Sequence, residues 1–109
     1  MKKLCEFKIF INKKDGLELV AEDVIEVHHK DRCYAFIDVL GIGVELENVL
    51  VKSISVKEEK IELIEHPLIS NFLKLIQADL DKAKGFKDRE EVVKLWEEFK
   101  VIGNKIFLG

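Results

Sequence analysis

The spacing of the hydrophobic residues changes near residue 66, and this change divides the 109-residue chain into two parts. Before it, hydrophobic and polar residues alternate with the period of two that is typical of β-strands. After it, hydrophobic residues recur every three or four positions, which is the spacing of amphipathic helices. The pattern predicts an α+β protein: a small antiparallel β-meander or barrel over residues 1–65, then an antiparallel helical hairpin over residues 66–109.

The first part is expected to contain short strands joined by tight turns. In the first strand, Leu4 to Asn12, the alternation places Cys5 on the same face as three hydrophobic residues. Asp15-Gly16 is a common hairpin pair, and Glu22-Asp23 is interpreted as a break between the second and third strands. These and the later strands are expected at 4–12, 17–20, 24–29, 33–40, 44–46, 49–57 and 60–65.

The second part is expected to contain two amphipathic helices. Gly85 suits the end of the first helix. Asp88 stands three residues before Glu91, which is the spacing of a capping box and marks the start of the second helix. Gly103 is expected to end that helix and to leave a short apolar tail, residues 106–108, that could add an edge strand. The short link after Gly85 favours a hairpin that packs on the β-domain or on a dimer partner.

The composition excludes several classes of protein. Eighteen basic and twenty-one acidic residues give a net charge of −3, whereas a general nucleic-acid binder is normally basic. No apolar run approaches the roughly 18 residues that span a bilayer, and the first residues lack a signal-peptide core. We therefore expect a soluble, cytoplasmic protein without a membrane partner. The abundance of Lys and Glu, with a single Gln, is typical of a thermophile.

The usual catalytic signatures are missing from the sequence, so we do not expect an enzyme. There is no Walker A loop, dinucleotide fingerprint or nucleophile elbow. Gly41-Ile42-Gly43 lacks the third glycine that a phosphate-binding loop requires. Asp38 is expected to accept backbone hydrogen bonds at the Gly41 loop, and together with His29 it would be the starting point for any search for catalysis.

The candidate metal ligands are spread along the chain, and no pair has the spacing that brings two ligands together on one element. His28 and His29 are neighbours on an expected strand, so they point to opposite faces. On residue type alone, both cysteines are interpreted as buried thiols. They would be free in a reducing cytosol, while a Cys5–Cys33 disulfide stays open for a thermophile. The candidates are Cys5, Cys33, His28, His29 and His66.

Three segments of the first part resemble the CooT family of small proteins. They are Cys5-Glu6-Phe7-Lys8-Ile9-Phe10, Leu19-Val20-Ala21-Glu22-Asp23-Val24 and Ile37-Asp38-Val39-Leu40-Gly41, followed by a closing Ile61-Glu62-Leu63 strand. The resemblance covers residues 4–65. It implies a homodimeric accessory protein that binds nickel, one site per dimer, for a client metalloenzyme. It also implies that Cys5 of each chain is the metal ligand.

The chain departs from the family pattern in two ways. Met1-Lys2-Lys3-Leu4 precedes Cys5, so the thiol has no free amine beside it, and deprotonated backbone amides would have to replace that ligand. The helical hairpin is the second departure, because the shortest members of the family lack it. It would either cover the metal site or supply a different dimer interface through Trp96 and Phe99.

Two alternative functions remain open at this point. The first is a non-catalytic protein-interaction module without a metal, in which the amphipathic hairpin binds the partner. The second is an RNA-binding small β-barrel, since some relatives carry that older label and such domains combine basic grooves with stacking aromatics. The residues available for RNA are Lys8, Phe10, Lys13, Lys14, Lys30 and Tyr34.

Overall fold

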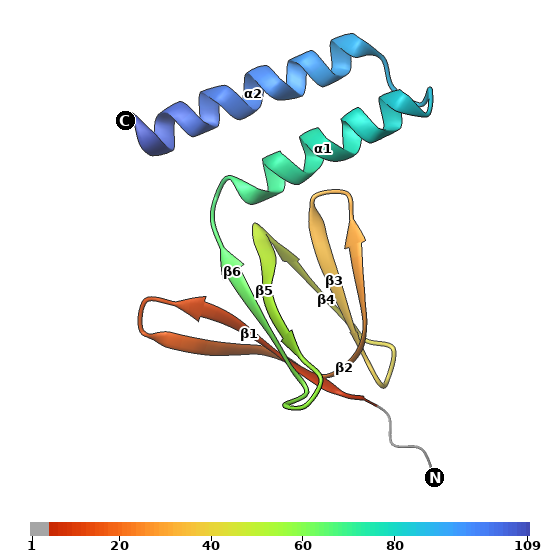
Figure 1. Cartoon of the computed structure of the whole chain (residues 1–109), viewed down its shortest axis with the longest axis vertical. Coiled ribbons are helices and arrows are strands. Elements are labelled where there is room, and N and C mark those ends of the chain that lie inside the picture. Colours follow the sequence, from red (N-terminus) through yellow and green to blue (C-terminus); the bar gives the residue numbers. More distant parts are fainter. Residues whose placement is uncertain (1–4) are drawn as a thin grey trace.

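Six strands form one curled sheet, and two helices follow it (Figure 1). The computed structural model describes residues 5–109. The strands lie in the order β4-β3-β2-β1-β6-β5 across the sheet, and the sheet curls into a half-barrel. This architecture confirms the predicted α+β class. The strands are β1 (Phe7–Lys13), β2 (Gly16–Lys30), β3 (Cys33–Asp38), β4 (Gly43–Glu47), β5 (Val49–Ser55) and β6 (Lys60–Glu65).

One strand pair departs from an antiparallel meander. β1 and β6 run parallel, with Ile9 opposite Ile61 and Ile11 opposite Leu63. The other four pairs of neighbours are antiparallel. The first strand therefore lies in the middle of the sheet, between its sequence neighbour and the last strand.

The two edge strands are joined by a single residue. β4 and β5 lie at opposite edges of the sheet, yet only Asn48 separates them in the sequence. Asn48 has a φ of 60°, in the left-handed region that asparagine tolerates better than most residues. Because one residue cannot span an open sheet, the two edges must meet at Asn48, and this connection requires the curl.

The second strand is longer than predicted. β2 runs without a break from Gly16 to Lys30, so the predicted separation at Glu22-Asp23 is wrong. Asp23 instead has a φ of 55°, and the pairing of β2 shifts register at this level. Such irregularities bend and twist a strand, which lets β2 pair with β1 along its first half and with β3 along its second. The predicted strand start at Leu4 lies outside the described residues.

The core fills the inside of the curled sheet. Ile9 and Ile11 of β1 are buried as the alternation predicts, and they pack with side chains from five strands in all. This cluster is small for a chain of 109 residues, because a half-barrel encloses less than a closed barrel. The fully buried side chains are Ile9, Val24, Phe36, Val49 and Leu63.

The helices α1 (Ile69–Ala83) and α2 (Arg89–Phe107) form the predicted antiparallel hairpin (Figure 1). The Asp88 carboxylate accepts a hydrogen bond of 2.9 Å from the Glu91 N–H, which satisfies one free donor at the start of α2. Gly85 follows α1 with a φ of 84°, and glycine adopts this left-handed conformation without strain. Both predicted helix boundaries around the link are therefore confirmed.

The second helix does not end at Gly103. α2 continues to Phe107, so the predicted stop at Gly103 is wrong, and so is the edge strand expected from the apolar tail. A Cβ placed on Gly103 would lie 4.0 Å from Cδ2 of Leu68, so this glycine packs against the start of the hairpin. The Phe107 ring stacks on His66 with 5.8 Å between ring centres. These contacts favour the helical conformation over the weak helix propensity of glycine.

A network of hydrogen bonds holds the hairpin to the sheet where β4 meets β5. The backbone N–H of Asn48 donates to Oγ of Ser70 at 2.7 Å, and the Ser70 N–H donates to Oδ1 of Asn48 at 2.9 Å. The Ser70 hydroxyl also donates to the carbonyl of Arg32 at 2.8 Å. Ser70 is only 5% exposed, so these polar groups satisfy each other inside the junction.

Candidate metal centre

Cys5 is an exposed free thiol at one end of the sheet. It precedes β1 by two residues, and the N–H of Lys8 donates to the carbonyl of Glu59 at 2.9 Å, just before β6 begins. Phe7 is opposite Val24 of β2, and Val24 is opposite Asp38, the last residue of β3. The start of β1, the β5–β6 turn and the β3–β4 loop therefore lie at the same end, which we call the Cys5 end.

Exposed hydrophobic side chains gather at the Cys5 end. Leu40 is 80% exposed in the β3–β4 loop, and Val56 is 65% exposed in the β5–β6 turn. The loop is ordered by Asp38, whose Oδ1 accepts hydrogen bonds from the N–H groups of Leu40 and Ile42, both at 2.9 Å. The structural role predicted for Asp38 is confirmed. The Gly41-Ile42-Gly43 segment is a strand connection.

Sequence reasoning did not identify these hydrophobic residues as part of the candidate site. Leu40 and Ile42 flank Gly41, and Val56 directly precedes a run of charged turn residues. A large aliphatic side chain inside a tight turn has no sheet face to pack on. Its presence in these turns was the feature of the sequence that could have indicated an exposed hydrophobic surface. Individually such residues are common on protein surfaces, but these lie at the same end of the sheet as an exposed cysteine.

The second cysteine has a different environment. Cys33 begins β3, is partly buried, and donates a hydrogen bond of 3.4 Å from its Sγ to the carbonyl of Lys30. Burial raises the pKa of the Cys33 thiol, and the carboxylates of Glu45 and Glu47 raise it further. A protonated thiol is a poor metal ligand, since the thiolate is the form that binds. Both cysteines are free, so the structure does not form the Cys5–Cys33 disulfide.

The three histidines interact with their own neighbours. Nε2 of His28 lies 2.9 Å from Oε2 of Glu26, and His29 contacts the Tyr34 ring edge-on, with centres 5.4 Å apart. His66 accepts a hydrogen bond from the Leu68 N–H on its Nδ1, at 3.1 Å. Within residues 5–109, no three or more His, Cys, Asp or Glu side chains form a group that could hold a metal ion.

The hairpin lies at the opposite end of the sheet from Cys5. β6 runs parallel to β1, so it begins beside the start of β1 and ends at the junction with α1. Its six residues span about 20 Å. Figure 1 shows the same separation between the first described residues and the two helices. The hairpin therefore does not cover Cys5, and of its two expected roles only the interface remains.

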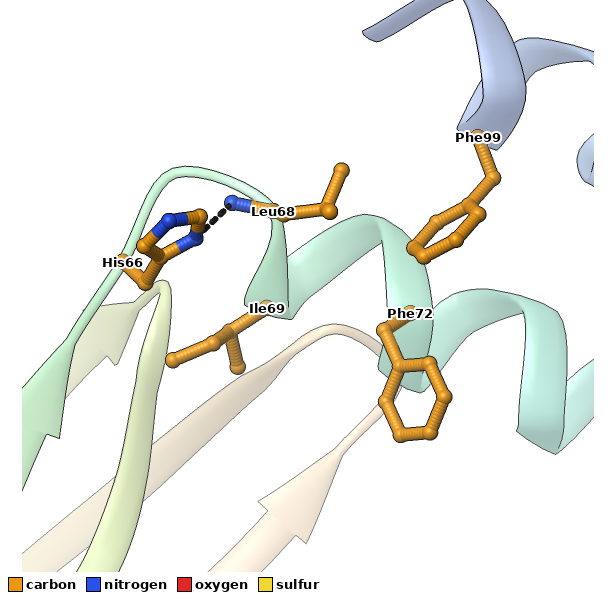
Figure 2. Close-up of a pocket in the computed structure, with 5 residues that line it drawn as sticks. All are labelled: His66, Leu68, Ile69, Phe72 and Phe99. Atoms are coloured by element: carbon orange, nitrogen blue, oxygen red, sulfur yellow. Dashed lines mark hydrogen bonds between the residues drawn. The ribbon is translucent and has the colours of Figure 1, made fainter. Parts of the chain in front are cut away.

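A cavity of about 230 Å³ lies where the hairpin begins (Figure 2). In Figure 2, Ile69 points toward the sheet and the Phe99 ring of α2 points toward Phe72 of α1. The lining is apolar except for the imidazole of His66, whose Nδ1 is already occupied by the Leu68 N–H. The cavity therefore lacks the converging polar groups that orient a substrate. Its lining residues are His66, Leu68, Ile69, Phe72 and Phe99.

Four of the six residues considered for RNA binding contact neighbouring side chains of the chain itself. Lys13 donates a hydrogen bond of 2.6 Å to Glu65, and this bond raises the pKa of Lys13. Lys30 pairs with Glu45 at 3.6 Å. Tyr34 packs against the core cluster, while Phe10 is covered by the ammonium group of Lys60. These contacts make the four side chains less available to phosphates and bases, which disfavours the RNA-binding alternative.

Comparison with known proteins gives a likeness in structure. No protein-family model matches the chain, and no curated protein matches it. A crystal structure described as "putative CooT from Carboxydothermus hydrogenoformans" matches with a TM-score of 0.53 and 21% sequence identity, and the match covers 98% of that chain and 57% of this one. The sheet has a CooT-like fold. The expected resemblance over the first part of the chain is thus confirmed for the fold, and the CooT-like sheet carries the helical hairpin as an addition.

No helix among residues 5–109 combines the length and the hydrophobicity needed to cross a membrane.

Proposed function

We propose that the protein is a metal-binding accessory protein of the CooT type. Two chains join through their Cys5 ends, and the two Cys5 thiolates together bind one nickel ion that is delivered to a client metalloenzyme. The observation that carries the proposal is the exposed Cys5 thiol at one end of a CooT-like sheet, the same end at which exposed hydrophobic side chains lie. Those side chains, Leu40 and Val56 among them, would be covered when two Cys5 ends meet.

The donor set of one chain is too small for a nickel site, which favours a shared one. One thiolate leaves most coordination positions empty, whereas a twofold axis beside Cys5 supplies a second thiolate from the same residue of the partner chain. Two thiolates with two deprotonated backbone nitrogens would suit the square-planar geometry of Ni(II). Cys33 is the weaker candidate, because its raised pKa and its hydrogen bond to Lys30 favour the neutral thiol.

The proposal is tested by titrating the reduced full-length protein with nickel. We expect thiolate-to-nickel charge-transfer absorption and, by native mass spectrometry, one nickel ion for two chains. Cys5→Ala should abolish both signals. Cys33→Ala is the matched control because it removes the other thiol, and it should leave both signals unchanged.

Other outcomes would contradict the proposal in different ways. Nickel binding that survives Cys5→Ala would remove the role of Cys5, and one nickel ion for each chain would remove the shared site. A second variant, Leu40→Glu, places a charge at the Cys5 end without touching the thiol. It should weaken nickel binding, because it keeps the two chains apart.

A further inference from the structure

One face of the helical hairpin is hydrophobic and uncovered. Phe72, Ile76 and Leu80 follow each other at intervals of four residues along α1, so they lie on one stripe. The Phe72 ring contacts Phe99 of α2, with centres 6.1 Å apart, and Phe99 stacks on Trp96 at 5.9 Å. The aromatic residues of α2 therefore lie on the same surface of the hairpin as the stripe of α1. We call this surface the hairpin face, and its residues are Phe72, Ile76, Leu80, Trp96 and Phe99.

The hairpin lacks the cover that such a face normally has. No residue of α2 is buried, and α2 lies beyond α1 from the sheet (Figure 1). The side chains of Phe72, Ile76, Leu80 and Trp96 are each exposed by 43% to 52%. The opposite side of the hairpin carries charged groups, including Lys74, Glu91 and Lys94. A two-helix layer with one apolar and one charged side has the pattern of half a four-helix bundle.

The chain exposes more surface than a compact monomer of the same mass does. The chain exposes 7849 Å², whereas a compact monomer of 12.6 kDa exposes about 6200 Å². Its radius of gyration is 16.5 Å, against about 13 Å for a compact domain of this length. The excess is about 1600 Å², which is more than the roughly 800 Å² per chain that a standard interface buries. The chain therefore has enough uncovered surface for the hairpin face to form such an interface.

The border of the hairpin face suits a second copy of the same chain. By helical spacing, Asp79 borders the stripe on α1, and Arg89 and Lys100 border it on α2. Lys100 lies over the Trp96 ring, 5.8 Å from its centre, and it pairs with Glu97 of its own helix at 3.1 Å. A twofold axis that sets α1 of one chain against α2 of the other brings Asp79 of one chain toward Arg89 of its partner. Such a surface is complementary to itself.

We infer that the hairpin face is a second homodimer interface, independent of Cys5 and of metal, in which two hairpins form a four-helix bundle. The two self-associating surfaces lie at opposite ends of each chain. Nickel would then join hairpin dimers through their Cys5 ends. Assemblies of four or more chains are expected only with nickel, and only if this inference and the proposed function both hold.

The test is the mass of the metal-free, reduced full-length protein, measured by sedimentation equilibrium in the presence of a chelator. We expect a dimer. Trp96→Glu and Ile76→Glu should each raise its dissociation constant about 30-fold or more, as expected for residues at the centre of an interface. Val101→Glu is the matched control: Val101 is 52% exposed but lies about 140° around α2 from Trp96. It should leave the dimer unchanged, as should Cys5→Ala.

Two results would overturn the inference. One is a monomer at every concentration measured, and the other is a dimer that Val101→Glu weakens as much as Trp96→Glu. Far-ultraviolet circular dichroism of each variant identifies any that fails to fold, and Ile76→Glu tests the same face from the other helix. Loss of nickel binding with an intact metal-free dimer would remove the proposed function and leave this interface in place.

Discussion

Asn48 and Ser70 bind each other twice, through backbone donors and side-chain acceptors on both sides. The Asn48 N–H donates to the Ser70 hydroxyl, and the Ser70 N–H donates to the Asn48 side chain, at 2.7 and 2.9 Å. The carbonyl of Asn48 also accepts the N–H of His66 at 3.0 Å. One residue therefore connects the two edges of the sheet and anchors the first helix.

Replacing Asn48 with alanine should destabilise the protein by about 2 to 3 kcal/mol. The variant leaves the Ser70 N–H without its acceptor in a buried position and puts alanine at a φ of 60°. Asn48→Gly should lose about 1 kcal/mol less, because glycine adopts this φ without strain. Denaturant unfolding measures both values. Equal losses in the two variants would contradict the contribution of the backbone conformation.

Two glycines of the hairpin should respond in opposite ways to alanine. Gly103 lies within α2, and its added Cβ would lie at an ordinary distance of 4.0 Å from Leu68. Gly103→Ala should therefore stabilise the protein by about 0.5 to 1 kcal/mol. Gly85→Ala should destabilise it by about 1 kcal/mol, since Gly85 has a φ of 84°. Thermal unfolding of both variants checks the signs, and a loss at Gly103 would mean that Leu68 cannot adjust.

Removing the Asp88 side chain should shorten the second helix at its start. Asp88→Ala loses the acceptor for the Glu91 N–H and should cost about 1 kcal/mol. The helical signal in circular dichroism should fall slightly. Asp88→Asn keeps an oxygen at the same position, so it should retain most of the stability. An Asp88→Asn variant as unstable as Asp88→Ala would indicate that the charge, and not the hydrogen bond, supports the helix.

The Cys33 thiol should react slowly at neutral pH and faster only at high pH. Burial raises its pKa, with further increases from Glu45 and Glu47, so the reactive thiolate is scarce. In Cys5→Ala, the rate of alkylation by iodoacetamide should have its midpoint above that of the same variant unfolded in denaturant. Glu45→Gln should lower the midpoint. A folded midpoint at or below the unfolded one would contradict the prediction.

The same raised pKa gives a pH dependence of stability. The folded protein holds the Cys33 proton more tightly than the unfolded chain does. This contribution is fully present below the unfolded pKa and is lost as the pH rises through the folded pKa. Between neutral and alkaline pH, the free energy of unfolding should therefore fall more for the wild type than for Cys33→Ala. Denaturant unfolding of both proteins at the two pH values measures this difference.

Local features of the fold could be predicted from the sequence. The spacing of Asp88 and Glu91 identified the start of α2, and Gly85 identified the end of α1, because each depends on atoms a few residues apart. The alternation in β1 identified Ile9 and Ile11 as core residues. Gly103 was misjudged because residue type alone does not distinguish a glycine inside a helix from one that ends it, and the helix continues to Phe107, whose ring stacks on the distant His66.

Features that depend on distant parts of the chain could not be predicted. Nothing near β1 indicates that β6 pairs with it, and nothing near Asp23 shows that β2 bends there and continues. For the candidate site, residue type favoured a buried Cys5, whereas the structure places it at an exposed end. Cys5 lies two residues before β1 begins, outside the paired part of the sheet, so the alternation that buries Ile9 and Ile11 does not apply to it.

The parallel pairing of β1 with β6 has a consequence for how the chain matures. Lys8 is opposite Lys60 and Ile9 is opposite Ile61, so β1 pairs with a strand that lies about fifty residues further along the chain. During synthesis the first hairpin can form early, but its second flank stays open until β6 has left the ribosome. Contacts so distant in sequence form late in folding. The Cys5 end therefore takes its final arrangement only when the last strand is in place.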